Sequence, residues 1–342
     1  MNGLRLSDLS RREFLHRATL AGAATILGIG SKAVAAEPVL ETTRIRLYQK
    51  PSICSAPQYL AEDFLRAEGF AQVEYPKIPG TRDIETALAS GRIDIGFHFA
   101  APNIIRLEAG DPIVMLAGGH IGCFELFGTN GVRAVRDLKG KTVAVIEIGS
   151  SQHVFLSTIL AYVGLSPAKD VNWIVRPGTE AKRLLSEGKI DALLGFPPDP
   201  QELRDKKIGR VILNSMMDRP WSHYFCCMVT ANREFVEKHP TATARALRAI
   251  LKANDLCARE PERVARFLVD RGYTASFKYA LQTMREMAMC YGHWRDYDPE
   301  DTLRFYALQL QEIGMIKSSP QKIVAQGTDW RFLRRLKQEL KI

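Results

Sequence analysis

Hydrophobic and polar residues alternate along the chain with two periods, and each change of period separates a predicted strand from a predicted helix. Residues 43–48 (TRIRLY) carry apolar side chains at every second position, which predicts a strand. Residues 51–70 carry them at helical spacing until Gly69, and glycine is a common helix terminator. Strands that alternate with helices predict crossover units on a largely parallel sheet. The same alternation predicts strands at 73–78, 92–99 and 112–119 and helices at 81–91 and 102–110.

A second series of the same kind begins near residue 137. A buried strand is predicted at 222–230, and helices continue from there to Ile342. The chain is therefore predicted to be an α/β protein with two sheets flanked by helices, and 342 residues suit two domains of average size. The second series comprises a strand within 137–149, a helix at 150–165, a strand at 171–177, a helix at 179–188, and strands at 189–196 and 207–214.

One corner occurs in both series. ALASGRIDIGFHFAAP at 87–102 and LLSEGKIDALLGFPPD at 184–199 share a helix end, a glycine, a base and an Ile-Asp pair before an apolar run. We expect the glycine to end the helix and the aspartate to serve the scaffold at the start of a strand. Ligands of open α/β sheets bind beyond the carboxyl ends of the strands. The residues after the two strands, 99–102 and 195–199, are thus predicted on opposite walls of one cleft.

The N-terminus has the pattern of a cleavable export signal. Residues 1–35 carry five bases against two acids, a contribution of +3, and a short apolar run rich in Ala and Gly follows Arg11-Arg12. The paired arginines resemble a twin-arginine signal, and the small residues before Ala36 predict cleavage near Ala35/Ala36. The run is too short to span a bilayer as an anchor. The mature protein is therefore predicted to be periplasmic.

Composition and charge bear on which classes of partner and cofactor the protein has. The chain has 46% hydrophobic and 25% charged residues, as globular proteins do. Its net charge of +9 raises the question of nucleic-acid binding, but Asp and Glu are interleaved with the bases, which is typical of a solvated surface. No nucleic-acid partner is predicted. The six cysteines form no C-x-x-C zinc motif, so buried thiols are expected, and no metal or cofactor is predicted.

Five segments resemble, in their order, the solute-binding proteins of ATP-binding-cassette (ABC) importers of the nitrate, sulfonate and taurine type. They lie within about residues 43–270: PSICSAPQYLAEDF, LASGRIDIGFHFAAP, DLKGKTVAVIEIGSSQHVFL, LLSEGKIDALLGF and the run from TANREFVEKHP. The resemblance implies a two-lobed periplasmic-binding-protein fold of type II. It also implies closure by hinge bending over a small ligand, and docking of a monomer on a membrane permease.

The lobes expected from this resemblance follow the two series of elements. Residues 36–126 are assigned to the first part of lobe 1 and residues 127–222 to lobe 2, and residues 223–342 return to lobe 1 and add the C-terminal helices. Phe124–Gly128 and Tyr224–Val229 are predicted to be the two connecting strands of the hinge.

The best candidate for anion binding is the segment that enters the predicted helix at 150–165. The backbone N–H groups of Gly149, Ser150 and Ser151 are expected to point from the helix N-terminus into the cleft, where they favour sulfonate, carboxylate or nitrate. The alternative, that Ser150 or Ser151 only caps the helix, stays open.

Further candidates follow from the resemblance and from the predicted strand ends. Residues 52–58 resemble the family's other helix-start contact region, and Phe99, Phe124 and Phe196 could form an aromatic lining that suits a ring or an apolar tail. The predicted ligand-binding set beyond the helix N-terminus is Ser52, Ile53, Cys54, Ser55, Phe99, Ala100, His120, Gly122, Cys123, Phe196 and Asp199.

Two alternatives to transport remain at the level of sequence. A ligand sensor read by a membrane receptor would use the same clamp. An enzyme of thiamine-pyrimidine synthesis belongs to the same superfamily, but those proteins carry a longer cysteine cluster than Cys226-Cys227. The chain has no nucleophile-elbow, zinc-helix or phosphate-loop motif, so we predict a binding protein and not an enzyme.

Overall fold

The structure is a computed structural model, which describes residues 38–49, 52–78 and 83–340. The export signal predicted at residues 1–35 lies outside the described residues. From Leu40 onward the chain forms one compact unit. Within the described residues, no helix combines the length and the apolar composition needed to cross a membrane.

The first sheet has three strands in the order β3-β10-β4. Strand β10 (Phe225–Asn232) lies between β3 (Ile95–Phe99) and β4 (Ile113–Ile121) and runs antiparallel to both. The parallel pair β1 (Arg44–Arg46) and β2 (Gln72–Glu74) continues toward this sheet, because Leu47 forms a parallel bridge with Ile95. Strands β3 and β4 therefore run in the same direction, as crossover units require, and β10 enters between them from the other end.

The second sheet has five strands in the order β7-β6-β8-β5-β9. Strand β6 is parallel to β7 and β8, whereas β5 is antiparallel to β8 and β9. The antiparallel strands β5 and β10 contain most of the two segments predicted to connect the lobes. The bounds of the five strands are β5 Glu125–Gly128, β6 Lys141–Val145, β7 Val171–Val175, β8 Ala192–Gly195 and β9 Arg210–Asn214.

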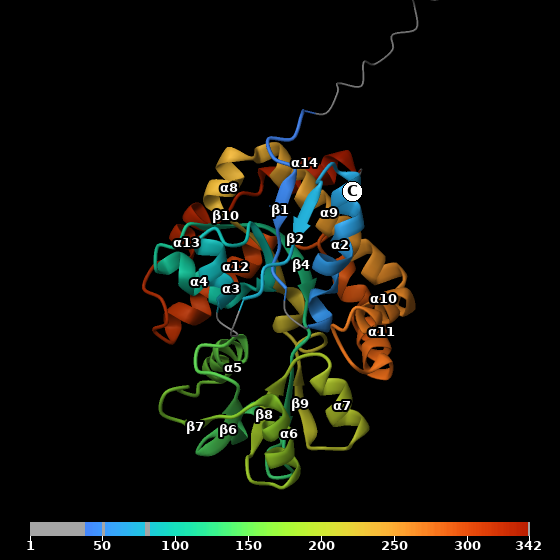
Figure 1. Cartoon of the computed structure of the whole chain (residues 1–342). Helices are drawn as coiled ribbons and strands as arrows, with labels where there is room; N and C mark the ends of the chain where they lie inside the picture. Colours follow the sequence, from blue (N-terminus) through green and yellow to red (C-terminus); the bar gives the residue numbers. More distant parts are fainter. Residues whose placement is uncertain (1–37, 50–51, 79–82, 341–342) are drawn as a thin grey trace, which may run out of the picture. The chain divides into compact units, whose positions relative to one another are not determined.

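Helices flank both sheets (Figure 1). Helices α5, α6 and α7 accompany the five-stranded sheet, while the helices that follow β10 return to the three-stranded sheet, where α9, α11, α13 and α14 contact β4. The bounds are α2 Ala56–Ala67, α3 Asp83–Ala89, α4 Ala100–Glu108, α5 Ser151–Tyr162, α6 Gly178–Ser186, α7 Asp199–Asp205, α8 Arg233–Lys238, α9 Pro240–Arg259, α10 Pro261–Asp270, α11 Phe277–Gly292, α12 Pro299–Glu312, α13 Pro320–Gly327 and α14 Arg331–Glu339, with short 3-10 turns η2 Ile53–Ser55, η3 Val135–Leu138 and η4 Trp221–His223.

The two copies of the repeated corner have the same local structure. Gly91 and Gly188 follow α3 and α6 with φ of 66° and 65°, a conformation that glycine adopts without strain. A carboxylate oxygen of Asp94 accepts a hydrogen bond from the backbone N–H of Arg46 at 2.7 Å, and one of Asp191 accepts from that of Thr142 at 2.9 Å. Each aspartate thus fastens its strand to the parallel neighbour, which is a scaffold role.

The residues after the first corner differ from the prediction. The sequence predicts a strand up to Phe99 and a helix from Pro102, but Ala100 already begins α4 and is fully buried. Proline is tolerated in the first turn of a helix, so Pro102 can occupy the third position of α4. The first wall of the predicted cleft is therefore a strand end followed at once by a helix.

Candidate functional site

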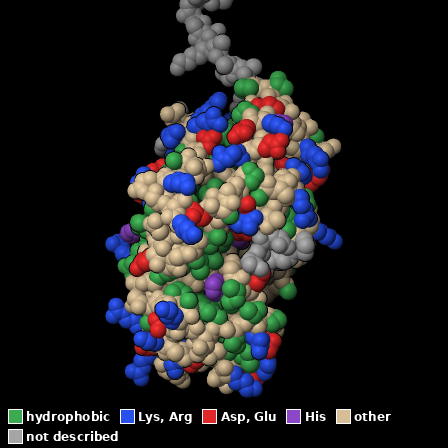
Figure 2. Space-filling model, turned by 90° about the vertical axis from the view of Figure 1, so that its left-hand side faces the viewer, with side chains coloured by type: hydrophobic (Ala, Val, Ile, Leu, Met, Phe, Trp, Pro, Cys, Tyr) green, Lys and Arg blue, Asp and Glu red, His purple; other side chains and the backbone are tan. Residues whose placement is uncertain are grey.

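A small cavity lies between elements of the two sheets. Its volume is about 50 Å³, and since one water molecule needs roughly 10–15 Å³, the space holds a few waters or a small solute. Figure 2 shows hydrophobic side chains and a histidine gathered around a furrow on one face. Among the described residues that line the cavity there is no Lys or Arg. The lining residues are Tyr48, Ser52, Ser55, His98, Phe99, Cys123, Phe124, Ser151, Gln152, Phe196, Cys226 and Cys227.

Six of the predicted ligand-binding residues line this cavity and eight do not. Sequence reasoning did not name Tyr48, His98, Gln152, Cys226 or Cys227 as ligand contacts. The six that line it are Ser52, Ser55, Phe99, Cys123, Ser151 and Phe196. The eight that lie outside the lining are Ile53, Cys54, Ala100, His120, Gly122, Gly149, Ser150 and Asp199.

The N-terminus of α5 satisfies part of its own hydrogen bonding. The hydroxyl of Ser150 accepts from the backbone N–H of His153 at 3.4 Å, and the N–H of Gly149 donates to Nδ1 of His153 at 3.1 Å. Burial lowers the pKa of His153, which favours the neutral ring that accepts this bond. The N–H of Gly149 and the hydroxyl of Ser150, both predicted to bind an anion, are therefore engaged in hydrogen bonds with His153. Ser151 is the residue of this segment that lines the cavity.

Ser151 meets a histidine from the other sheet. Its Oγ lies 3.4 Å from Nε2 of His98, which belongs to β3. On the other side of the ring, Nδ1 lies 2.9 Å from a carboxylate oxygen of Glu85, although the two are not aligned as a hydrogen bond. Serine, histidine and glutamate thus form a polar row that joins α5 to β3 and α3 across the cavity.

Aromatic side chains form another part of the wall. The ring centroids of Phe99 and Phe124 lie 5.5 Å apart, and those of Phe124 and Phe196 lie 6.4 Å apart, each pair edge to face. The three phenylalanines expected to line the cleft do line it. Phe99 also packs on Phe155 and Tyr306, so that ring serves the core as well.

Asp199, another predicted contact, is engaged in an ion pair. It is the first residue of α7, and its carboxylate pairs with Nζ of Lys182 at 2.7 Å. Lys182 also pairs with Glu202. The charge of Asp199 is thus compensated within the five-stranded half, and its side chain is not part of the cavity lining.

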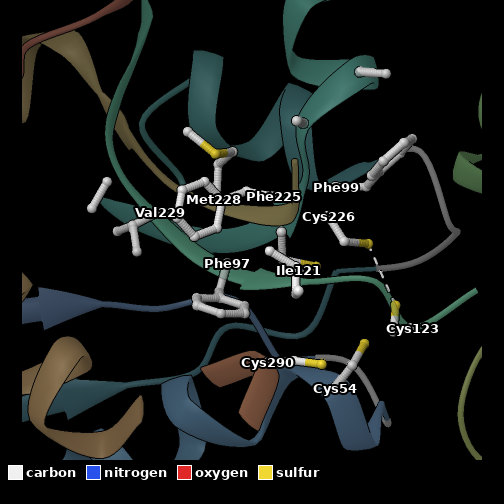
Figure 3. Close-up of a cluster of buried hydrophobic side chains, with 14 of the residues drawn as sticks. Cys54, Phe97, Phe99, Ile121, Cys123, Phe225, Cys226, Met228, Val229 and Cys290 are labelled. Atoms are coloured by element: carbon white, nitrogen blue, oxygen red, sulfur yellow. Dashed lines mark hydrogen bonds between the residues drawn. The ribbon is translucent and has the colours of Figure 1, made fainter. Parts of the chain in front are cut away.

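Thiols form the floor of the cavity. All six cysteines are buried and free, and the sulfur atoms of Cys54, Cys123 and Cys226 point toward one another (Figure 3). The Sγ atoms of Cys123 and Cys226 are 3.4 Å apart, and Sγ of Cys54 lies 3.1 Å from Oγ of Ser52. His120, predicted at a partly exposed strand end, is instead fully buried beside these thiols, between the rings of Phe97 and Tyr291.

The thiols perturb one another. Hydrogen bonds from Cys123 and Cys227 hold the pKa of the Cys54 thiol well below its usual range, although burial opposes ionisation. Burial raises the pKa of Cys226, but hydrogen bonds from Cys123 and Cys227 lower it by more. Burial raises the pKa of the Cys123 and Cys227 thiols well above the usual value. The pKa shifts of neighbouring thiols therefore have opposite directions: downward for Cys54 and Cys226, upward for Cys123 and Cys227.

Two sheets linked by antiparallel crossing strands, with one cavity lined from both, define a periplasmic-binding-protein fold. The crystal structure of the periplasmic nitrate-binding protein NrtA from Synechocystis has this arrangement, with a TM-score of 0.75 at 17% identity over 89% of this chain and 90% of that one. The chain belongs to the NMT1-like family, which matches residues 41–268.

Curated relatives fall into two groups. The nitrate/nitrite-binding protein NrtA of Nostoc is 26% identical over 320 residues, covering 78% of this chain and 71% of that protein. A 4-amino-5-hydroxymethyl-2-methylpyrimidine phosphate synthase of Saccharomyces cerevisiae, THI5, is 27% identical over 203 residues, covering 55% of this chain. This chain spans only 58% of the length of that synthase. Binding proteins and a synthase are thus both similar to this chain.

Proposed function

We propose that this protein is the extracytoplasmic solute-binding component of an ABC import system. It captures a small anionic molecule of the sulfonate, nitrate or aromatic-acid class between its lobes and delivers it to a membrane permease. Export by the N-terminal signal, cleavage near Ala35/Ala36, a periplasmic location and a monomeric state belong to the proposal.

One observation carries this proposal: side chains from both sheets wall the same cavity. Ser151 and Phe196 belong to the five-stranded half, whereas Ser52, His98 and Phe99 belong to the other. A ligand that contacts both walls favours the state in which the walls are close. The loaded protein then differs in shape from the empty one, and a permease can distinguish the two. The similarity to nitrate-binding proteins supports the same conclusion.

The lining suggests how an anion would be held. Hydroxyls of Ser52, Ser55 and Ser151, the amide of Gln152 and the ring of His98 supply donors. Without a lysine or arginine among the described lining residues, these donors suit a singly charged group better than a doubly charged one. The small volume favours a compact headgroup at this point of the cavity.

The proposal is tested by ligand screening of the mature protein. Nitrate, alkanesulfonates, aromatic acids and pyrimidines are added in turn while thermal unfolding is followed. A ligand present at a hundredfold excess over its Kd stabilises the folded state by about 2.7 kcal/mol, so Tm should rise by several degrees. If no solute of these classes raises Tm, the import proposal is wrong.

The matched variants are Ser151→Ala and Ser186→Ala. Loss of the Ser151 hydroxyl should weaken binding about tenfold, which corresponds to about 1.4 kcal/mol. Ser186 is an exposed serine whose hydroxyl bonds the carbonyl of Arg183 on α6, so its replacement should leave affinity unchanged. Equal affinities of the two variants would remove Ser151 from the site.

A second candidate function is pyrimidine synthesis of the kind named for the yeast relative, and its support is the similarity over 203 residues. It requires product formation and not only binding. Incubation of the protein with a cell extract, followed by mass spectrometry for newly formed pyrimidine phosphate, separates the two functions: accumulation of this product favours catalysis, and its absence favours transport.

A further inference from the structure

Five soft donors from separate segments meet at the floor of the cavity. Cys54 comes from η2, His120 from the end of β4, Cys123 from the segment that leads to β5, and Cys226 and Cys227 from β10. All five are buried, and we call this group the thiol–imidazole cluster. His120 and Cys123 are three residues apart and Cys226 and Cys227 are adjacent, and the fold brings these two pairs and Cys54 together.

The spacing of the donors suits a single metal ion. The donor atoms of Cys54, His120 and Cys123 lie within 4.8 Å of one another, and so do those of His120, Cys226 and Cys227. Around a tetrahedral ion with metal–sulfur bonds of about 2.3 Å, neighbouring sulfurs are about 3.8 Å apart. The separation of 3.4 Å between Cys123 and Cys226 is close to this value. The two overlapping triads could therefore close on an ion with small side-chain movements.

His120 is oriented as a metal ligand. Its Nδ1 lies 3.1 Å from the backbone carbonyl of Ile121, an arrangement that places the proton on Nδ1 and leaves the lone pair on Nε2. Nε2 is buried and has no hydrogen-bond partner, although a buried polar atom is normally paired. The sulfurs of the cluster lie within 4.8 Å of the imidazole donor atom, so a soft cation bound at Nε2 would also reach soft sulfur ligands.

The backbone also points to a requirement for sulfur. Cys123 has φ of 115°, in a region that L-residues avoid and glycine adopts freely. A residue needed only for packing would be expected to be glycine at this position. The thiol side chain is kept there despite the strain.

The cluster is reached from the cavity. Cys123, Cys226 and Cys227 line the cavity, while Cys54 and His120 lie behind them. An ion that enters with the solvent of the cavity would meet the first three sulfurs before it reached the imidazole. Thiolate and imidazole donors select soft cations over Mg²⁺ and Ca²⁺.

We propose that the thiol–imidazole cluster binds one thiophilic metal ion, Zn²⁺ or Cu⁺, through His120 and two or more of the cysteine sulfurs. Two thiolates and one neutral imidazole around Zn²⁺ give a set without net charge, which lowers the cost of burying the ion. This site goes beyond the proposed import function and does not depend on it, since it can be occupied whichever solute the cavity carries.

The test is a titration of the full chain, kept reduced by a phosphine, with Zn²⁺ and separately with Cu⁺ in competition with a chromophoric chelator. We expect one equivalent of at least one of these ions to bind. X-ray absorption of the loaded protein should show sulfur neighbours at about 2.3 Å and, for Zn²⁺, a nitrogen neighbour at about 2.0 Å. This measurement needs no variant and therefore does not depend on how variants fold.

Substitutions of single donor residues identify which side chains bind the ion. Cys226→Ser and His120→Gln should each weaken binding by about a hundredfold or more. Cys257→Ser is the control, because Cys257 is a fully buried thiol of α9 outside both triads. The metal affinity of this variant should match that of the native chain. Circular dichroism checks that each variant is folded.

Three results would overturn the proposal. They are the absence of stoichiometric binding of both ions, an absorption spectrum with oxygen and nitrogen neighbours only, and equal affinities of folded His120→Gln and Cys257→Ser. The failure of this site is distinguishable from failure of the import proposal, because solute binding is measured separately by the shift in Tm.

Discussion

The carboxylate of Glu41 connects the beginning of the described chain to a helix 200 residues later. Its two oxygens accept hydrogen bonds from the backbone N–H groups of Thr241 and Ala242, at 2.9 and 3.0 Å, in the first turn of α9. These N–H groups have no partner within the helix, so the carboxylate acts as a cap supplied from a distance. Burial opposes ionisation of Glu41, but the hydrogen bonds from Thr241 and Ala242 together lower its pKa to about 2.

Because this pKa is depressed in the folded state, the stabilisation by Glu41 is complete above its ordinary value of 4.5 and is lost as the pH falls toward about 2. Glu41→Gln should lower the free energy of unfolding at pH 7 by up to about 1 kcal/mol, since the group is largely exposed. The difference from the native chain should vanish with acidification. Urea unfolding at a series of pH values measures it.

Glu237→Gln is the control for this prediction, because Glu237 is an exposed residue of α8 near the same helix start. A pH-independent difference between Glu41→Gln and the native chain would contradict the capping role.

Single residues also show where prediction from sequence succeeded and failed. Ser151 and Phe196 were found because each follows a recognisable strand in its own series. His98 was missed because its contact with Ser151 joins residues 53 positions apart in sequence, on elements of different sheets. The thiol–imidazole cluster was missed for the same reason, since its three parts, Cys54, the His120/Cys123 pair and the Cys226/Cys227 pair, are far apart in sequence.

At the scale of elements, both aspartates of the repeated corner fasten a strand to its neighbour, but their ion pairs differ in strength. Asp94 also bonds the guanidinium of Arg46, with Oδ1 and Nη2 2.5 Å apart in a partly buried pair. Asp191 instead has Nζ of Lys141 at 3.6 Å, in a more exposed pair. Hydrogen bonds to charged groups contribute more than neutral ones, and exposed pairs contribute little. The first copy of the corner is thus more firmly fastened than the second.

Asp94→Asn should therefore cost about 2 kcal/mol of unfolding free energy and Asp191→Asn about 1 kcal/mol or less. Both should leave solute affinity unchanged, because neither side chain lines the cavity. Denaturant unfolding and solute titration measure the two quantities. A loss of affinity at unchanged stability would assign these aspartates to binding instead of the scaffold.

Most elements could be predicted from the apolar periods, but strand direction could not. Strand β10 is buried at every position, so its sequence has no alternation that distinguishes parallel from antiparallel pairing. Its antiparallel entry between β3 and β4 is decided by the route of the chain back from the five-stranded sheet. The start of α4 at Ala100 could not be predicted either, because proline is typical of the first helical position and Pro102 therefore indicated a helix from residue 102.

At the scale of the whole unit, polar contacts outside the cavity lining join a helix of the five-stranded half to a helix that packs on the three-stranded sheet. Arg204 of α7 bonds Glu125 of β5 and, at 2.7 Å, Glu286 of α11. Gln201 also donates to Glu286, at 2.8 Å, and Lys278 of α11 pairs with Asp205 at 2.5 Å. Since α7 follows β8 and α11 contacts β4, this contact favours the arrangement in which both sheets wall the cavity.

Glu286→Ala should shift the clamp toward an open state and weaken solute binding about fivefold, which is about 1 kcal/mol. The radius of gyration of the ligand-free protein, measured by small-angle X-ray scattering, should increase. Glu262→Ala is the matched control: this exposed glutamate of α10 pairs with Arg266 and Arg285, both on the helical side. Unchanged affinity in Glu286→Ala would show that the contact does not contribute to closure.

The repeated corner has a further consequence, for protein engineering. Asp94 and Asp191 fasten the beginnings of the two strands. Residues at the ends of these strands can therefore be substituted with less effect on the two sheets. Phe196 is partly exposed and lines the cavity, whereas Phe99 is buried in the core as well. A library meant to retarget the cavity should therefore vary Phe196 first and hold Phe99 fixed until a new specificity has been selected.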